Sequence, residues 1–367
     1  MTMQTPSEPD ELTPDDVKPV ESGLDAAPEE EVLPSAEEIA ALKARAISEP
    51  LLTHLYTADP SAHVFEGKVY IYPSHDIDAG TPFDDEGGHF GMQDYHVLCQ
   101  DTPEGPARDC GIALHVRDVP WADRQMWAPD AAEKNGRYYL YFPAKTRDNR
   151  FLIGVAVGDR PEGPFSAEPE PIEGAYSIDP AVYADEDGEY YLYFGGLWGG
   201  QLQKYRDNAY DPENIEPEGE QPALGARVAR LRSDMKTLAE PTREVQILDE
   251  HGQPLLAADH ERRYFEGPWL HKHAGKYYFS YSTGNTHLLC YATGDSPYGP
   301  FTYQGVILTP VLGWTTHHSI CEVAGKWYLY YHDSLHSGGV THLRTVKVTE
   351  LQHDENGHIQ TIHPYGE

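Results

Sequence analysis

The sequence is poor in basic residues. Its 367 residues include 27 Lys and Arg against 60 Asp and Glu, which gives a formal net charge of −33 at pH 7. A surface this negative repels phosphates, so sequence-independent binding to nucleic acid is excluded, and anionic membranes and polyanionic substrates are disfavoured. A neutral substrate fits this charge best.

Cysteines and long apolar runs are also scarce. No apolar run is long enough to cross a bilayer, and the N-terminus lacks the basic and apolar regions of a signal peptide. These absences predict a cytoplasmic protein without a membrane partner. Four cysteines show no C-x-x-C spacing, and we expect them to be reduced thiols rather than disulfides or zinc ligands: Cys99, Cys110, Cys290 and Cys321.

The first 48 residues contain no aromatic side chain and are rich in Pro, Glu and Asp. Such a segment cannot bury enough apolar surface to offset its chain entropy. We therefore expect residues 1–48 to form an acidic, largely disordered tail, with one or two helical turns over 37–47. Residues 49–367 would form one folded domain.

The remaining sequence contains a motif repeated five times: a glycine, a polar residue, then tyrosines and aliphatic residues. Each copy predicts a tight hairpin turn followed by a strand. With a matching segment before each glycine and a third-strand echo after it, the repeat predicts an all-β, five-bladed β-propeller with four antiparallel strands per blade. A β-sandwich with tyrosine-rich strands is the disfavoured alternative. The copies are GKVYIYPS (67–74), GRYYLYFPA (136–144), GEYYLYFGG (188–196), GKYYFSYST (275–283) and GKWYLYYHD (325–333).

A polar or aromatic residue stands eight or nine places before each of these glycines. Because equivalent positions of successive blades surround one central channel, we expect the five side chains to meet at one end of it. Three are carboxylic acids, which favours hydrolysis of a glycosidic bond: one acid protonates the leaving oxygen and one carboxylate activates water or attacks the sugar. The five are Asp59, Trp127, Asp179, Glu266 and His317.

The neighbours of the acids suggest different roles for them. Phe265 and the nearby Trp269 are apolar and could raise the pKa of Glu266, as a general acid requires. Proline follows both Asp59 and Asp179, which predicts an extended backbone at each. A third acid can hold the protonation state of the general acid through its charge.

Taken together, the motifs ADPSAHV, YIYPSHD, DYHV, WAPD, YSIDPAV, DGEYYLYFGG, YFEGPW and HHSI resemble glycoside hydrolase family 43 over about residues 52–350. The resemblance implies a five-bladed propeller and an inverting mechanism on β-xylosides, α-L-arabinofuranosides or arabinan. By motif match, Asp59 resembles the general base and Glu266 the general acid. Asp179 resembles the third acid, which tunes the pKa of the general acid and orients it. In an inverting enzyme the base and acid carboxyls are about 6.5–9.5 Å apart.

Further positions carry over from the resemblance as substrate contacts. Trp127 in WAPD is expected to be an aromatic wall or, equally, blade core. Arg344 in HLRTV is expected to hydrogen-bond sugar hydroxyls, and Asp76 either supports the site or forms a structural salt bridge. Trp198 and Phe83, in glycine-rich segments 194–205 and 80–96, could stack on a sugar and help to close the pocket.

Two adjacent histidines complete the expected site. His317 resembles the family's channel histidine, which implies a divalent cation, with calcium the expected ion and water supplying most ligands. His318 is expected to contact substrate, since the register of HHSI leaves open which ring faces the channel. His271 and His273 alternate on one strand and are expected to be exposed.

The chain ends with its fifth blade, so no C-terminal β-sandwich is expected, and the sequence resembles the single-domain branch of the family. Loops, with segments 80–96 and 194–205 as the candidates, or a neighbouring subunit of a homo-oligomer would then close the pocket, and the proline-rich insertion at 203–225 is expected to be a loop over one face. The expected function is an inverting exo-glycosidase that releases xylose from short β-1,4-xylo-oligosaccharides, with α-L-arabinofuranosidase side activity. The alternatives are an arabinan-degrading enzyme and a non-catalytic sugar-binding propeller, although the latter has no need of three acids.

Overall fold

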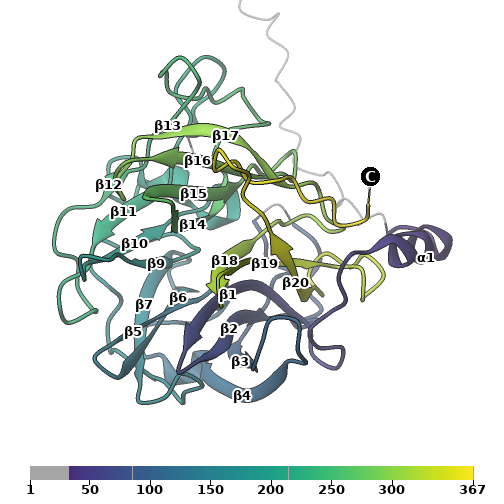
Figure 1. The fold of residues 1–367 in the computed structure, drawn as a ribbon. Coiled ribbons are helices and arrows are strands. Elements are labelled where there is room, and N and C mark those ends of the chain that lie inside the picture. The colour runs from purple at the N-terminus through teal and green to yellow at the C-terminus, as the bar shows by residue number, and fades with distance from the viewer. Residues whose placement is uncertain (1–32, 85, 214, 367) are drawn as a thin grey trace, which may run out of the picture.

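The structure, a computed structural model, describes residues 33–84, 86–213 and 215–366. Most of the tail predicted to be disordered falls on residues 1–32 and lies outside the described residues. The predicted helical turns are present as α1 (Ala36–Arg45), which begins at a capping box between Ser35 and Glu38. No residue of α1 is buried, and the helix lies outside the sheets, close to the C-terminus (Figure 1).

The remaining chain forms five sheets of mainly antiparallel strands arranged around a centre, which confirms the predicted five-bladed propeller (Figure 1). The first blade contains β1 (Thr57–Phe65), β2 (Lys68–His75), β3 (Asp94–Gln100) and β4 (Arg108–His115). The second contains β5 (Asp130–Lys134), β6 (Arg137–Lys145), β7 (Phe151–Gly158) and β8 (Ser166–Ala167). The third contains β9 (Ala181–Ala184), β10 (Tyr190–Phe194), β11 (Arg227–Arg230) and β12 (Arg243–Glu244).

The last two blades depart from four strands each. The fourth sheet joins β14 (Glu266–His273), β15 (Lys276–Ser282), β16 (Leu289–Gly294) and β17 (Phe301–Leu308) to β13 (Ile247–Leu248), which pairs with β17 in parallel. Within the described residues, the fifth sheet has three strands: β18 (His318–Val323), β19 (Lys326–Asp333) and β20 (Thr345–Leu351). Short 3₁₀ turns occur at Val116–Asp118, Trp198–Gly200 and Leu202–Tyr205.

The repeated glycines form the predicted hairpin turns. In four blades a two-residue turn has positive φ at both positions, which is the type I′ geometry that joins twisted antiparallel strands. These pairs are Glu66-Gly67, Asn135-Gly136, Ala274-Gly275 and Ala324-Gly325. The third copy has a longer turn, since Ala184 pairs with Tyr190 across the intervening residues.

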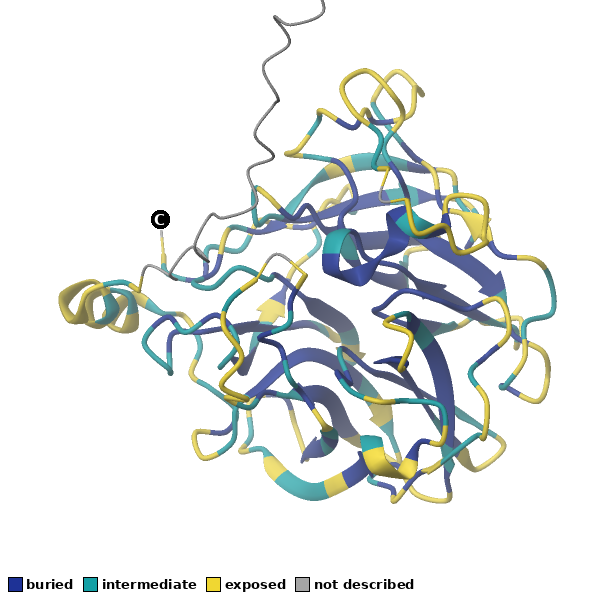
Figure 2. Cartoon of the chain, turned by 180° about the vertical axis from the view of Figure 1, so that it is seen from behind, coloured by how far each residue is buried: buried dark blue, intermediate teal, exposed yellow. Residues whose placement is uncertain are grey.

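The first strands of the blades form a closed ring, because β1 lies beside β5 and β18, and β9 and β14 complete the circle. Alternating tyrosines and aliphatic residues of the second strands, such as Tyr193, Phe279 and Tyr330, are fully buried between the blades. Burial is concentrated in these central strands, whereas the loops and α1 are exposed (Figure 2). The ring therefore holds the N-terminal ends of the five inner strands in one place.

Among the described residues, no helix is long and apolar enough to cross a membrane. The four cysteines are free, and Cys99 and Cys290 are buried. The expectation that His271 is exposed is wrong: its ring is buried and stacks on Tyr278, with centroids 4.9 Å apart, beside Trp327. The inner strand of a propeller blade has neighbours on both faces, so alternation along it does not produce an exposed side.

Candidate active site

The five residues that precede the repeated hairpins line a single pocket of about 760 Å³. Asp59 lies in β1 and Glu266 begins β14, while Trp127, Asp179 and His317 lie shortly before the inner strands of their blades. The pocket thus lies over the end of the ring where the inner strands begin. The three predicted catalytic acids are together in it.

The backbone at two of the acids differs from the expectation of extended structure. Asp59 and Asp179 have φ values of 50° and 56°, in the left-handed region. Asp enters this region at lower cost than most residues, because its short side chain can hydrogen-bond locally. At Asp59 the strand register also shifts between Ala58 and Ser61. A β-bulge of this kind redirects a side chain, and here it accompanies the placement of Asp59 in the pocket.

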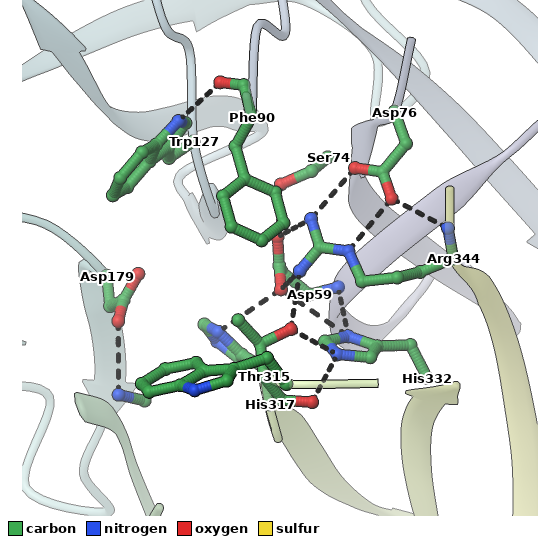
Figure 3. Close-up of polar contacts among 12 residues, drawn as sticks. Asp59, Ser74, Asp76, Phe90, Trp127, Asp179, Thr315, His317, His332 and Arg344 are labelled. Carbon is green, nitrogen blue, oxygen red and sulfur yellow. Dashed lines mark hydrogen bonds and ion pairs between the residues drawn. The ribbon is translucent and has the colours of Figure 1, made fainter. Parts of the chain in front are cut away.

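The Asp59 carboxylate is held by positive charge and a hydroxyl (Figure 3). Arg344 donates two hydrogen bonds to it, at 2.9 and 3.2 Å, and the Ser74 hydroxyl donates a third at 2.6 Å. Burial alone would raise the pKa of Asp59, but the charge of Arg344, followed by smaller contributions from neighbouring histidines, lowers the pKa to about 2. Asp59 is therefore ionised at neutral pH.

Every N–H of the Arg344 guanidinium already has a protein acceptor. Besides Asp59, the acceptors are the Asp76 carboxylate, at 2.8 Å to both Nε and Nη2, and the Thr315 hydroxyl at 2.9 Å. Arg344 also lines the pocket, and its hydrogen bonds to sugar hydroxyls stay a prediction. Asp76 is fully committed to Arg344 and does not line the pocket, so the structure places it as a support of the arginine.

His332 is a neighbour of Asp59 that sequence reasoning missed. Its Nδ1 accepts a hydrogen bond from the backbone N–H of Asp59 at 2.9 Å, and its Nε2 lies 3.0 Å from the Thr315 hydroxyl. An accepting Nδ1 requires a neutral ring with the proton on Nε2. Burial and the charge of Arg344 lower the pKa of His332 to about 3, in agreement with a neutral ring. Its only sequence signal is its place at the end of the fifth repeat, YLYYHD.

Glu266 and Asp179 form the opposite side of the pocket. Burial, and then the negative charge of Asp59, raise the pKa of Glu266 to about 8. Burial and the neighbouring Glu266 raise the pKa of Asp179 well above its ordinary value, although Asp179 accepts a hydrogen bond at 3.1 Å from the backbone N–H of Gly267. This pair therefore keeps at least one proton at neutral pH.

Apolar rings surround this acidic pair. Phe265, Trp198 and Trp314 line the pocket, and Trp198 packs edge-on against Phe265 with centroids 5.1 Å apart. Trp314 is a second residue that the repeat did not reveal, since it lies in the loop before β18. Trp269, proposed from the sequence as a neighbour of Glu266, is instead buried and donates to the backbone oxygen of Ile320.

The two tryptophans predicted to contact sugar both line the pocket and are both fixed by hydrogen bonds. Trp127 donates through Nε1 to the backbone oxygen of Phe90 at 2.8 Å (Figure 3). Trp198 donates to the Glu216 carboxylate at 2.9 Å. Glu216 belongs to the insertion at 203–225, so this predicted loop reaches the pocket through Trp198.

The segments proposed to close the pocket approach each other closely. Phe83, His89 and Phe90 of segment 80–96 line the pocket, as do Leu197, Trp198, Gly199 and Gly200 of segment 194–205. A Cβ on Gly199 would lie 2.7 Å from the backbone oxygen of Glu86, and one on Gly87 would lie 2.7 Å from the Trp127 ring. Glycine at 199 therefore allows the two segments to meet, and glycine at 87 leaves room for the Trp127 ring.

The adjacent histidines of HHSI have different environments. His317 lines the pocket, with Nδ1 3.7 Å from Oδ1 of Asp59. His318 does not line it: the ring is buried and its Nε2 lies 2.6 Å from the Ser280 hydroxyl. The prediction of a substrate contact is therefore wrong for His318, because the two side chains alternate at the start of β18.

Comparison with known proteins agrees with this geometry. The family model described as glycosyl hydrolases family 43 matches residues 47–359. The chain belongs to glycosyl hydrolase family 43. A xylosidase/arabinosidase of Bacteroides ovatus is 60% identical over 308 residues, which cover 84% of this chain and 95% of the relative.

Solved structures of family 43 proteins have the same fold. A GH43_1 enzyme of Xanthomonas citri complexed with xylose is 67% identical, with a TM-score of 0.88 over 91% of this chain and 98% of that one. A GH43 β-xylosidase/α-arabinofuranosidase from a compost microbial metagenome, in complex with xylotriose and in a calcium-free form, is 62% identical. Its TM-score is 0.86 over 87% of this chain and 98% of that one.

Proposed function

We propose that this family 43 protein is an inverting exo-glycoside hydrolase that releases xylose from short β-1,4-xylo-oligosaccharides, with α-L-arabinofuranosidase side activity. One observation carries the proposal: a single pocket holds a carboxylate with a pKa near 2 and a carboxylic acid with a pKa near 8. Carboxyls held in opposite protonation states can supply the base and the acid of glycoside hydrolysis at neutral pH.

In the proposed mechanism, Asp59 takes a proton from a water molecule as the water oxygen attacks the anomeric carbon. Glu266 donates its proton to the glycosidic oxygen, and the bond from that oxygen to the anomeric carbon breaks. The attack comes from the face opposite the leaving group, so the configuration inverts. The step ends with Asp59 protonated and Glu266 ionised, and exchange with solvent restores both.

Asp179 and the aromatic residues support this step. Burial and the neighbouring Glu266 favour the protonated form of Asp179, and its bond to the Gly267 N–H fixes it next to Glu266, where it would orient the acid. Trp127, Trp198 and Trp314 present apolar rings on which the carbon face of a sugar can stack. The xylosidase/arabinosidase relative and the relative complexed with xylose support xylose and arabinose as the sugars.

The exo mode is supported by the shape of the site. One pocket, bordered by segments 80–96 and 194–205, suits the end of a short chain better than the middle of a polymer. A xylotriose complex of a relative supports an oligosaccharide as substrate.

A divalent cation, expected to be calcium, is a separate part of the proposal. His317 would hold it at the base of the pocket, with water completing the oxygen ligands that calcium prefers. The donor set fits a weakly held ion, since no cluster of three ligand side chains surrounds His317 in the described part of the chain. Bound there, the ion would supply positive charge beside Asp59. Chelator should lower the melting temperature of the wild type and leave that of His317→Ala unchanged.

We also propose a cytoplasmic location, which four free cysteines and a preference for short substrates support. Fractionation of cells that produce the full chain tests this location. Its failure would leave the proposed chemistry intact.

Proton NMR of xylobiose with the purified protein tests the proposed function. The xylose from the non-reducing end should form as the α-anomer, in excess of the α/β mixture that the reducing end contributes, and mutarotation later converts it to the equilibrium mixture. An early excess of β-xylose over the reducing-end mixture would contradict inversion, and no product from xylobiose but release from α-L-arabinofuranosides would move the main activity to arabinose. Binding of both substrates without hydrolysis would favour a sugar-binding propeller.

A further inference from the structure

A group of histidine and aspartate side chains lies in the first blade, outside the pocket. It consists of His75 at the end of β2 and of Asp94 and His96 at the start of β3. One ligand atom from each residue lies within 4.8 Å of the other two. None of the three lines the pocket, and the proposed reaction uses none of them.

The register of the strands brings these residues together. Ile71 pairs with Leu98 in the antiparallel ladder of β2 and β3, and extending this register places His75 opposite Asp94. Asp94 and His96 are two residues apart and so project from the same face of β3. The cluster thus follows from the sheet itself and depends on no flexible loop.

The distances suit a small divalent ion bound by nitrogen and oxygen. Oδ1 of Asp94 lies 2.6 Å from Nδ1 of His75 and 4.0 Å from Nε2 of His96. Two ligands of a tetrahedral Zn²⁺ are about 3.3 Å apart, given bonds of about 2.0–2.1 Å. Side-chain adjustments of less than about 1 Å would place all three atoms around one ion.

Asp109 provides a carboxylate partner for the ring of His96, which is a feature of metal sites. Its Oδ1 lies 2.9 Å from Nδ1 of His96 and accepts a bond from the Gly111 N–H at 2.8 Å. A carboxylate on Nδ1 fixes the proton there and leaves Nε2 of His96 as a lone-pair donor toward Asp94. Carboxylate–histidine pairs orient metal ligands in this way.

The cluster is sheltered but accessible. The side chains of His75, Asp94 and His96 are 18%, 13% and 12% exposed, which leaves an open side for water as a fourth ligand. His115, the cross-strand partner of Asp94, uses its Nδ1 to accept from the Arg117 N–H. Three protein ligands and water are a common donor set for zinc.

We propose that His75, Asp94 and His96 form a binding site for a divalent transition metal ion, with Zn²⁺ the best match to its two imidazoles and one carboxylate. When the ion binds through Nδ1 of His75, that ring carries its proton on Nε2 and the hydrogen bond to Asp94 is replaced by two metal bonds. The ion would join the end of β2 to the start of β3. Its ligand His75 immediately precedes Asp76, which supports Arg344.

The test is titration of the chelator-treated full-length protein with Zn²⁺ by calorimetry, and with Co²⁺ by visible absorption. We expect one Zn²⁺ per chain, an intense Co²⁺ spectrum typical of four or five ligands, and a higher melting temperature with Zn²⁺. His96→Ala should lose all three, and Asp109→Asn should weaken binding about 10- to 100-fold. His358→Ala is the matched control, because His358 pairs with Asp354 on the surface without a third ligand.

Two results would overturn the proposal: no stoichiometric binding by the wild type, or full binding by His96→Ala. Melting temperatures without metal show whether each variant is folded, and His75→Gln replaces His96→Ala if the latter is not. Zn²⁺ binding that survives in His317→Ala separates this site from the proposed calcium position. Binding lost in His317→Ala but kept in His96→Ala would assign the ion to the pocket and contradict the inference.

Discussion

The two sides of the pocket place carboxyl groups of the same chemical type in opposite surroundings. On the Asp59 side, the carboxylate receives bonds from Arg344 and Ser74, and its pKa is lowered to about 2. On the Glu266 side, no described residue forms an ion pair with Glu266 or Asp179, aromatic rings line the wall, and the pKa of Glu266 is raised to about 8.

This difference shows how a neighbouring positive charge can reverse the effect of burial on a carboxyl pKa. Both carboxyls are removed from bulk water, and desolvation favours the neutral form of each. A single arginine, fixed by Asp76 and Thr315, reverses the result for Asp59 only. The proposed roles of Asp59 as base and Glu266 as acid therefore depend on the position of the Arg344 guanidinium.

Replacing the acid should have the largest effect. Glu266→Gln keeps the shape of the side chain but cannot donate a proton, so kcat/KM for xylobiose should fall about 10²- to 10⁴-fold. Aryl xylosides with good leaving groups should lose less, because they need less protonation. Steady-state kinetics on both substrates measure this, with Glu66→Gln, outside the pocket, as control. Equal activity of wild type and variant would remove Glu266 as the acid.

Replacing the base should have a similar effect but a different signature. Asp59→Asn cannot accept the proton of water, and we expect a loss of about 10²- to 10⁴-fold for all leaving groups. Added azide should not restore a product of retained configuration, since no nucleophilic residue is involved. NMR of the azide reaction is the measurement, and a glycosyl azide of retained configuration would require a covalent intermediate on another carboxylate and would contradict the inverting mechanism.

Replacing Arg344 should make the carboxyl pKa values on the two sides of the pocket more alike. Arg344→Lys keeps the charge but replaces a planar five-donor group by a point charge, so the pKa of Asp59 should rise toward its ordinary value. We expect kcat/KM to fall about 10-fold or more at neutral pH, and its acidic limb to move to higher pH. The pH profile distinguishes this from a general folding defect, which would lower activity without moving the limb.

The raised pKa of Glu266 should also affect stability. The folded state holds this proton up to about pH 8, whereas the unfolded state loses it near pH 4.5. The contribution is therefore present below pH 4.5 and is lost as pH rises through 8. Glu266→Gln should become more stable than the wild type by about 2–4 kcal/mol at pH 8. Denaturant unfolding at pH 5 and pH 8 tests this, and a constant difference would contradict it.

The smallest effect is expected at the aromatic wall. Glu216→Gln weakens the hydrogen bond that fixes Trp198, which should cost about 1 kcal/mol and raise KM for xylobiose about fivefold with little change in kcat. Kinetics separate the two constants. A fall in kcat alone would place Trp198 in the chemical step instead of in substrate binding.

The sequence predicted the parts of the site that the repeat encodes. Asp59, Asp179 and Glu266 share a register relative to the five hairpins, and that register brought them to one pocket. His332 and Trp314 have no such register, since the first ends a second strand and the second lies in a loop. The position of His332 depends on how blade five closes against blade one, whereas Trp314 is placed by its contacts with Trp198 and Phe265.

The hydrogen-bond partners of individual side chains could not be predicted from the sequence either. Arg344 was expected to bind sugar, and its bonds to Asp59, Asp76 and Thr315 are known only from the structure. The left-handed backbone at Asp59 depends on a bulge that the Asp-Pro pair alone does not indicate. Such features come from packing between strands that are far apart in the chain.

The most direct test of this account is a ¹³C NMR titration of protein labelled at the glutamate side-chain carboxyls. The resonance that is absent from the spectrum of Glu266→Gln belongs to Glu266. We predict that this resonance titrates near pH 8, so that the acid keeps its proton at neutral pH. A midpoint near 4.5 would leave both sides of the pocket ionised and would contradict the proposed division between acid and base.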